Sequence, residues 1–155
     1  MIEATTLAYL AGVIDSDGFI SAHRKKRGDL TYTAPLIGIS GTSPEPHELA
    51  YSVWGGSLFT YAPKNPQHRL QFQWQAVGVR AANAIRDIEP YLRSKSRQAS
   101  IAIEMWKMID GGVHRTDSRL FDMAAQLSDL NLRNPPLKPI PPELQLRQFP
   151  PGASA

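Results

Sequence analysis

The first apolar positions of the chain recur at the spacing of an α-helix, which places them on one face. Thr5 or Thr6 offers a hydroxyl that can cap the start of this helix, and Gly18 offers a stop at its other end. The pattern predicts a helix over residues 7–16, whose buried face carries Leu7, Leu10, Ala11 and Ile14.

Four later segments alternate between apolar and polar residues, as strands with one buried face do. The alternation is most regular where Leu70, Phe72 and Trp74 alternate with three glutamines. We expect the apolar set to face the core and the glutamines to form a polar face. The predicted strands cover residues 19–24, 31–40, 57–62 and 69–76, and a polar turn joins the first two into a hairpin.

Further helical patterns cover residues 44–54, 79–92, 96–109 and 117–130. The resulting order, α-β-β-α-β-β-α-α-α, predicts an α+β fold with a four-stranded antiparallel sheet and helices on one side. We expect a single domain over residues 1–133. Seven of the 13 prolines fall after Asn134, so residues 134–155 are expected to form an extended tail.

The bulk composition excludes several classes of protein. No apolar run reaches the roughly 18 residues that a membrane span needs, and the chain has no cysteine for a disulfide. The four histidines lack metal-ligand spacing, which argues against a zinc site. The net charge of +3 is weak evidence for a nucleic-acid partner, but basic residues cluster at residues 23–27, 64–69 and 93–97.

One segment of the chain carries a specific signature. Residues 10–18 read Leu-Ala-Gly-Val-Ile-Asp-Ser-Asp-Gly and resemble the motif of the LAGLIDADG homing endonucleases, with seven of nine positions identical. An EF-hand calcium loop is excluded, because Ile20 and Lys26 stand where that loop needs glycine and glutamate. The resemblance implies the αββαββα core of that family and an antiparallel sheet that binds DNA.

The motif helix carries small side chains on one face, which allow a second helix to approach closely. In the family two such helices pack side by side, and each delivers one acidic residue to the site. This chain has one motif and no internal repeat, so the second helix should come from a second copy. The resemblance implies a homodimer whose interface includes Ala8, Ala11, Gly12 and Asp15.

Asp17 matches the family's catalytic metal ligand, and the backbone carbonyl of Ser16 is expected to add a second ligand. Hydrolysis of a phosphodiester needs an activated water and stabilisation of the leaving oxygen, which divalent cations held by carboxylates supply. Mg²⁺ is the natural ion for such an all-oxygen site. The resemblance implies a mainly structural role for Asp15 near the helix end.

Lys95 resembles the family's lysine that reaches the site from the start of a late helix, where a cation stabilises the phosphate. If the register differs, Arg93 or Arg97 takes this place. One feature departs from the family. Relatives often place glutamine or asparagine after the second strand to hold water near the metal, whereas Gly41 stands here. This leaves Ser40, Thr42 or other groups to complete the site.

Because the polar face of a twisted antiparallel sheet fits the major groove, it is expected to read DNA bases. The residues expected to contact base edges are Ser21, His23, Lys25, Tyr32, Thr60, Arg69, Gln71, Gln73 and Gln75. Phosphate contacts are expected from Lys26, Arg27, Lys64, Arg93 and Arg97.

The resemblance implies a site-specific, intron-homing endonuclease that makes Mg²⁺-dependent double-strand breaks in a long pseudo-palindromic DNA target. Short 3′ overhangs are expected. Alternatives on the same fold are an intron RNA splicing cofactor (maturase) and a non-cutting DNA-binding regulator. The retained Asp17 and Lys95 favour cleavage. No membrane partner is expected, and the compartment would be the cytoplasm of a bacterial or phage host, or an organellar matrix or stroma.

Overall fold

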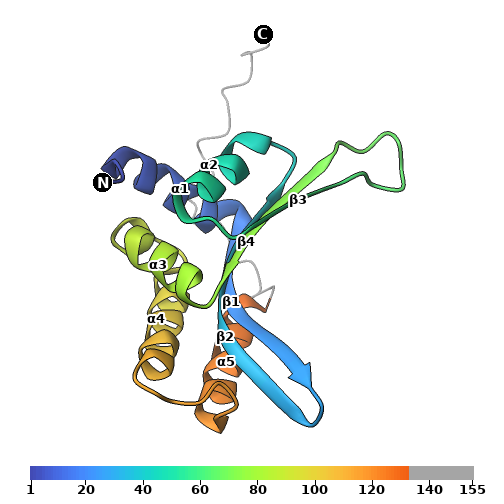
Figure 1. Ribbon diagram of the computed structural model, residues 1–155. Helices are drawn as coiled ribbons and strands as arrows, with labels where there is room; N and C mark the ends of the chain where they lie inside the picture. The colour runs from blue at the N-terminus through green and yellow to red at the C-terminus, as the bar shows by residue number, and fades with distance from the viewer. Residues whose placement is uncertain (133–155) are drawn as a thin grey trace, which may run out of the picture.

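A computed structural model describes residues 1–132 of the chain (Figure 1). The helices are α1 (Ala4–Asp17), α2 (Pro44–Trp54), α3 (Val79–Ile88), α4 (Ser96–Asp110) and α5 (Ser118–Asn131), with a short 3₁₀ helix η1 (Glu89–Tyr91). The strands are β1 (Gly18–Arg27), β2 (Leu30–Gly41), β3 (Ser57–Tyr61) and β4 (Gln71–Val77). The predicted element order is confirmed, and the tail proposed for residues 134–155 lies outside the described residues.

The four strands form one antiparallel sheet in the order β1-β2-β4-β3. The β1–β2 hairpin runs without a break from the pair Gly18 and Ile39 to the pair Arg27 and Leu30. It is longer than predicted, because polar residues near the turn continue the backbone ladder. Strand β4 pairs only with the second half of β2, so the outer half of the hairpin extends beyond the other strands (Figure 1).

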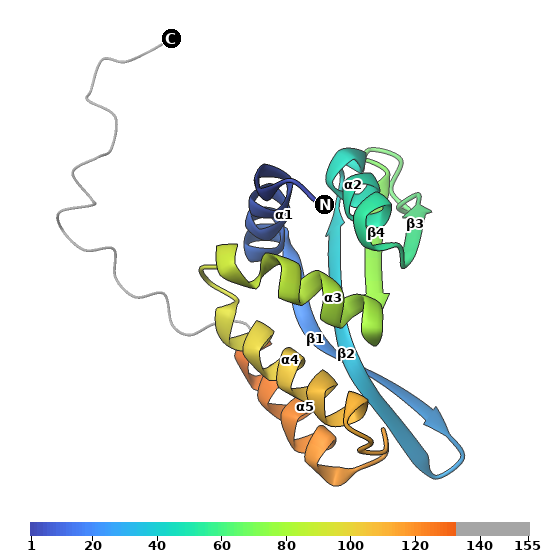
Figure 2. The same ribbon diagram turned by 60° about the vertical axis from the view of Figure 1, so that its left-hand side comes forward.

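Helices cover one face of the sheet and leave the other open. Figure 2 shows α3, α4 and α5 lying along the same side of the strands. Ile14 of α1, Ile37 of β2, Trp74 of β4 and Ile85 of α3 are fully buried between the layers. Within residues 1–132 no helix is long and apolar enough to cross a membrane.

Three local expectations are wrong. Thr5 and Thr6 do not cap the first helix, because α1 already begins at Ala4, after the N-cap residue Glu3. Leu70 does not face the core, because it precedes the first residue of β4 and is 47% exposed. The core reaches only the inner part of that strand, where Trp74 lies. The helix expected over residues 79–92 ends at Ile88 and continues as η1. Pro90 has no N–H group to donate, so the α-helical ladder cannot pass through it.

The loop between α4 and α5 fills the edge of β2 that β4 does not reach. The Thr33 N–H donates to the carbonyl of Arg115, in this loop, over 2.9 Å. Next to it, the N–H of Gly78, the residue between β4 and α3, donates to the carbonyl of Pro35 over 2.9 Å. These bonds satisfy backbone groups that would otherwise lack partners. The contact fixes the loop beside the outer half of the hairpin.

Candidate functional site

A set of hydrogen bonds, here named the Asp15 clamp, joins the end of α1 to the loop before α4. The Asp15 carboxylate accepts the N–H groups of Arg93 (2.7 Å) and Lys95 (3.0 Å) and the hydroxyl of Ser94 (3.0 Å). Partial burial raises the pKa of Asp15, but these donated hydrogen bonds outweigh it and hold the pKa below its ordinary value. Both carboxylate oxygens are engaged within one chain, which fits the expected structural role of Asp15 near the helix end, and its place at a dimer face stays a prediction.

Lys95 is the N-cap residue of α4 and lies against the end of α1. Its ammonium group donates to the backbone carbonyl of Asp15 over 2.6 Å. The last carbonyls of a helix lack partners within it and carry partial negative charge, so a cation is favourable there. The clamp thereby holds the Lys95 ammonium group at Asp15, which lies two residues before Asp17 in α1. Arg93 and Arg97 flank it and are exposed.

Asp17 is the last residue of α1, and its side chain is exposed. It borders a cavity of about 270 Å³, here named the Asp17 cavity, with a wall formed by the end of β2 and the start of α2. The residues that line this cavity are Val13, Asp17, Ile39, Ser40, Gly41, Thr42, Ser43, Pro46 and His47. His47 was not predicted as a site residue, because its position in α2 follows the helical pattern of a core side chain.

The donor atoms near Asp17 suit a hard cation. Ser16 lies in the last turn of α1, where carbonyls lack partners within the helix, so oxygen atoms of two successive residues are available. Within residues 1–132 no three His, Asp or Glu side chains gather as a metal-binding group. Mg²⁺ is commonly held by one or two carboxylates together with waters and substrate phosphates, and this donor set fits that ion.

The open face of the sheet carries most of the polar residues expected to contact DNA. Directly opposed residues of neighbouring strands share a face, and alternate residues share it along a strand. The cross-strand pairs therefore put Ser21, His23, Lys25, Arg27, Tyr32, Gln71, Gln73 and Gln75 on one face. Ser40 pairs with Gln73, which connects this face to the Asp17 cavity.

Some predicted residues lie elsewhere. Thr60 pairs with Phe72, so it lies on the face opposite to Gln73, and its predicted place among the base-reading residues is wrong. Strand alternation likewise separates Lys26 from Lys25. Arg69 precedes β4 rather than lying within it, and Lys64 lies in the loop between β3 and β4. The structure does not bring these loop residues to the Asp17 cavity.

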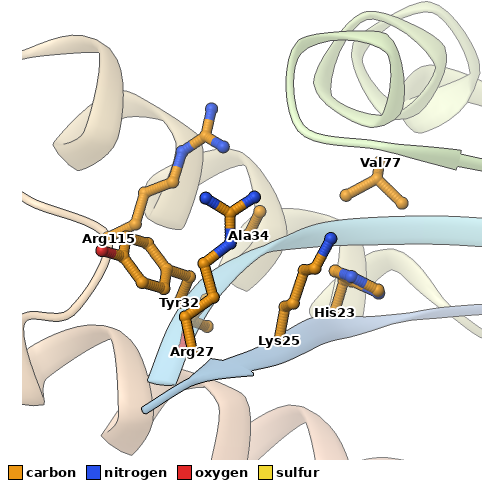
Figure 3. A pocket seen from close by; sticks show the side chains of 8 residues that line it. His23, Lys25, Arg27, Tyr32, Ala34, Val77 and Arg115 are labelled. Carbon is orange, nitrogen blue, oxygen red and sulfur yellow. The ribbon is translucent and has the colours of Figure 1, made fainter. Parts of the chain in front are cut away.

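Basic side chains gather over the outer half of the hairpin, around a second cavity of about 380 Å³ (Figure 3). His23, Lys25 and Arg27 come from β1, and Arg115 joins them from the loop between α4 and α5. The Arg27 guanidinium lies 5.7 Å from the centre of the Tyr32 ring. Among residues 1–132, no acidic residue lines this cavity. Arg115 was not predicted, because contacts between distant segments, the hydrogen bond to Thr33 and the packing of His114 against Tyr32, bring its loop to the sheet.

The exposed face of α1 is narrower than expected. Ala8 and Gly12 are exposed, but Ala11 is fully buried in the chain's own core. The expectation that Ala11 lies at a dimer interface is therefore wrong. At 100° per residue, position 11 lies beside Leu10 and Ile14 on the buried face.

The element order, the antiparallel sheet and the motif helix with Asp17 at its end define the LAGLIDADG homing endonuclease fold. Comparisons with protein-family models and with curated protein sequences gave no match. Solved structures of this fold match the chain with high significance. The three described below are each less than 20% identical to it in sequence.

I-CvuI, solved in complex with its target (Sro1.3) in the presence of Ca, aligns at a TM-score of 0.62 and 18% identity, covering 84% of this chain and 85% of that one. The archaeal intron-encoded I-Vdi141I, complexed with DNA, aligns at a TM-score of 0.68 and 19% identity. This alignment covers 86% of this chain and 88% of that one. The LAGLIDADG endonuclease I-SmaMI, bound to cleaved DNA, aligns at 0.65 and 14%, covering 81% of this chain but 45% of its own.

The Asp15 clamp predicts a pH-dependent contribution to stability. Because the folded-state pKa lies below the ordinary 3.8, the contribution is complete above that value and is lost as pH falls through the folded pKa. Asp15→Asn should lower the free energy of unfolding by about 1–3 kcal/mol at pH 7. The difference in free energy of unfolding between Asp15→Asn and wild type should shrink as the pH falls below the ordinary pKa of the aspartate carboxyl group.

Urea unfolding at one fixed protein concentration measures this effect. Asp122→Asn, an exposed carboxylate on α5, is the matched control and should leave stability within about 0.5 kcal/mol of wild type. Equal unfolding midpoints for Asp15→Asn and wild type at pH 7 would contradict the clamp.

Proposed function

We propose that two copies of this chain form a Mg²⁺-dependent, site-specific DNA endonuclease. One observation carries the proposal: Asp17 ends the motif helix and lines one cavity together with Ser40, a residue of the open sheet face. The acidic residue and the face suited to reading DNA therefore meet at one place. Solved structures of the same fold in complex with DNA support this reading.

The dimer in this proposal rests on the single motif and on the exposed face of α1. The chain aligns with 45% of I-SmaMI, so two copies would correspond to about one such longer chain. Ala8 and Gly12 are exposed small residues that permit a second helix to approach closely. Two-fold symmetry would then bring both Asp17 side chains together.

In the proposed site, the Asp17 carboxylates and the Ser16 carbonyls would hold Mg²⁺. When bound, the ion activates water and stabilises negative charge on the phosphate. Lys95, held at the end of α1 by its bond to the Asp15 carbonyl, adds positive charge beside the reacting phosphate. The Asp15 clamp orients Lys95 and takes no direct part in hydrolysis. Cleavage of both strands would follow from the symmetric pair of sites, and the short 3′ overhangs are proposed from the family resemblance.

The open sheet face would lie in the major groove of a long pseudo-palindromic target. Glutamine side chains pair with adenine through two hydrogen bonds, so Gln71, Gln73 and Gln75 suit base contacts. The cationic cluster of Figure 3, including Arg27 and Arg115, suits phosphates. We place the protein in the cytoplasm of a bacterial or phage host, or in an organellar matrix or stroma, where an intron-encoded endonuclease meets its target.

Gly41 favours a second candidate function, a DNA-binding regulator that does not cut. It stands at a wall of the Asp17 cavity and has no side chain to hold a water there. The same face would then bind DNA, while hydrolysis would be lost. Cleavage of DNA separates the two functions.

Cleavage by wild type and Asp17→Asn tests the endonuclease. The substrate is a plasmid that carries the uninterrupted form of the locus containing the coding sequence, incubated with Mg²⁺ or with EDTA. We expect linear product only with Mg²⁺, and a rate at least roughly 100-fold lower for Asp17→Asn, because about 3 kcal/mol of transition-state stabilisation is lost. Asp122→Asn is the control and should cut normally.

The other outcomes of this assay identify the alternatives. An intact plasmid together with tight, sequence-specific binding would indicate the non-cutting regulator. An absence of DNA binding together with tight binding to the structured intron RNA would indicate the splicing cofactor.

The dimer face is tested by Gly12→Leu. A Cβ atom added at Gly12 would meet no atom of the rest of the chain within 4 Å, so the fold should persist. The same side chain would hold two α1 helices apart and should raise the dimer dissociation constant at least about tenfold, which corresponds to about 1.4 kcal/mol. Sedimentation equilibrium measures this change, with Ala125→Leu on the exposed side of α5 as the control. An unchanged dissociation constant would place the interface elsewhere.

The cationic cluster is tested by Arg115→Ala in DNA-binding assays over a range of salt concentrations. Each phosphate contact contributes about 0.9 to the slope of log affinity against log salt. We expect the slope to fall by about that amount, with little change in preference among DNA sequences. Arg86→Ala, which removes an exposed arginine from α3, should leave the slope unchanged. A loss of sequence preference without a change of slope would refute a phosphate contact.

A further inference from the structure

His47 carries a buried polar atom that packing alone does not explain. Its side chain is 1% exposed, and its ring lies 5.9 Å from that of Phe72, at an interplanar angle of 40°. Its Nδ1 lies 2.7 Å from the Ser43 carbonyl, which can only accept, so Nδ1 carries the proton. In the neutral ring, Nε2 is then an acceptor, and it has no hydrogen-bond partner among the described residues.

The same side chain lines the Asp17 cavity together with Asp17, the last residue of α1. The cavity has room for water and polar groups to bind it, including the Asp17 carboxylate and the hydroxyls of Ser40 and Thr42. A water that bridges such a carboxylate and an imidazole nitrogen would satisfy both acceptors, since it donates two hydrogen bonds.

Gly41 leaves space for this arrangement. A Cβ atom at position 41 would lie 3.6 Å from Cε1 of His47, which is ordinary contact, and a longer polar side chain there would compete for the same part of the cavity. The imidazole of His47 can therefore take over the water-holding task of the polar side chain that position 41 of β2 lacks. Leucine at position 47 would fill a similar volume without leaving an unpaired nitrogen.

We propose that His47 is a positioning residue for the hydrolytic reaction: its Nε2 accepts a hydrogen bond from a water in the Asp17 cavity and orients that water toward Asp17. This inference rests on the proposed function. Because Gly41 has no side chain to hold a water, the inference assigns this task to His47 of α2. Cleavage can then be retained with glycine at position 41.

Single-turnover cleavage by His47→Leu and His47→Gln tests the proposal, with DNA affinity and melting temperature measured in parallel. The glutamine amide can reach the position of Nε2 and accept the same bond, whereas leucine only fills the space. We expect His47→Leu to cut at least about tenfold more slowly with DNA affinity within about twofold of wild type, and His47→Gln to cut within about threefold of wild type.

A second-site variant provides rescue. Adding Gly41→Asn to His47→Leu returns a polar group to the cavity from β2 and should recover most of the lost rate. Cleavage by His47→Leu at the wild-type rate would overturn the proposal. Equal losses of rate and DNA affinity in both position-47 variants would also overturn it, because they indicate a structural role.

The ring of His47 also gives a readout that does not depend on cleavage. Nitrogen chemical shifts in the wild-type protein should show a proton on Nδ1 and none on Nε2, and the ring protons should show cross-relaxation with a bound water. The opposite tautomer, or no water contact, would overturn the proposal. If wild type cuts no DNA, the endonuclease function fails, while the spectrum still decides whether His47 holds water.

Discussion

The carboxylate of Asp15 is the interaction on which the arrangement of the site depends. Its partners lie 78 to 80 residues further along the chain, so one side chain fixes the end of α1 against the start of α4. Its two oxygens accept three donors, which compensates for the cost of partial burial. Lys95 then meets the negative end of the helix dipole, so the charge and the backbone geometry favour the same arrangement.

The sheet divides structural and recognition roles between alternate residues. Along β1, Ile20 enters the core while Lys25 and Arg27 project from the open face, so the basic side chains remain in solvent and carry little desolvation cost. The outer half of the hairpin has no β4 beside it, and the loop between α4 and α5 satisfies that edge. The loop that completes the backbone hydrogen bonding also adds Arg115 to the cationic cluster.

The sequence pattern was sufficient for the features that depend on local spacing. Periodicity predicted every α-helix and strand of residues 1–132 in order but not the 3₁₀ helix η1, and the motif located Asp17 at the end of its helix. Features that depend on distant pairing were not predictable. The face of Thr60 depends on the register of a short strand exposed on both sides, and the place of Arg115 depends on a bond to another element. Helical spacing is compatible with burial of His47 and does not show that its side chain lines the Asp17 cavity.

The dimer face and the active site of the proposed enzyme are one surface. Asp17 ends the same helix whose exposed Gly12 would meet its partner, so in the proposed dimer close approach of the two α1 helices would also bring the two helix ends, with their carboxylates, near each other. Like charges oppose that approach, and a cation between them reverses the sign of the interaction. In the proposed enzyme, association, metal binding and the positioning of the DNA phosphate would therefore favour one another, because each would supply charge or ligands that the others require.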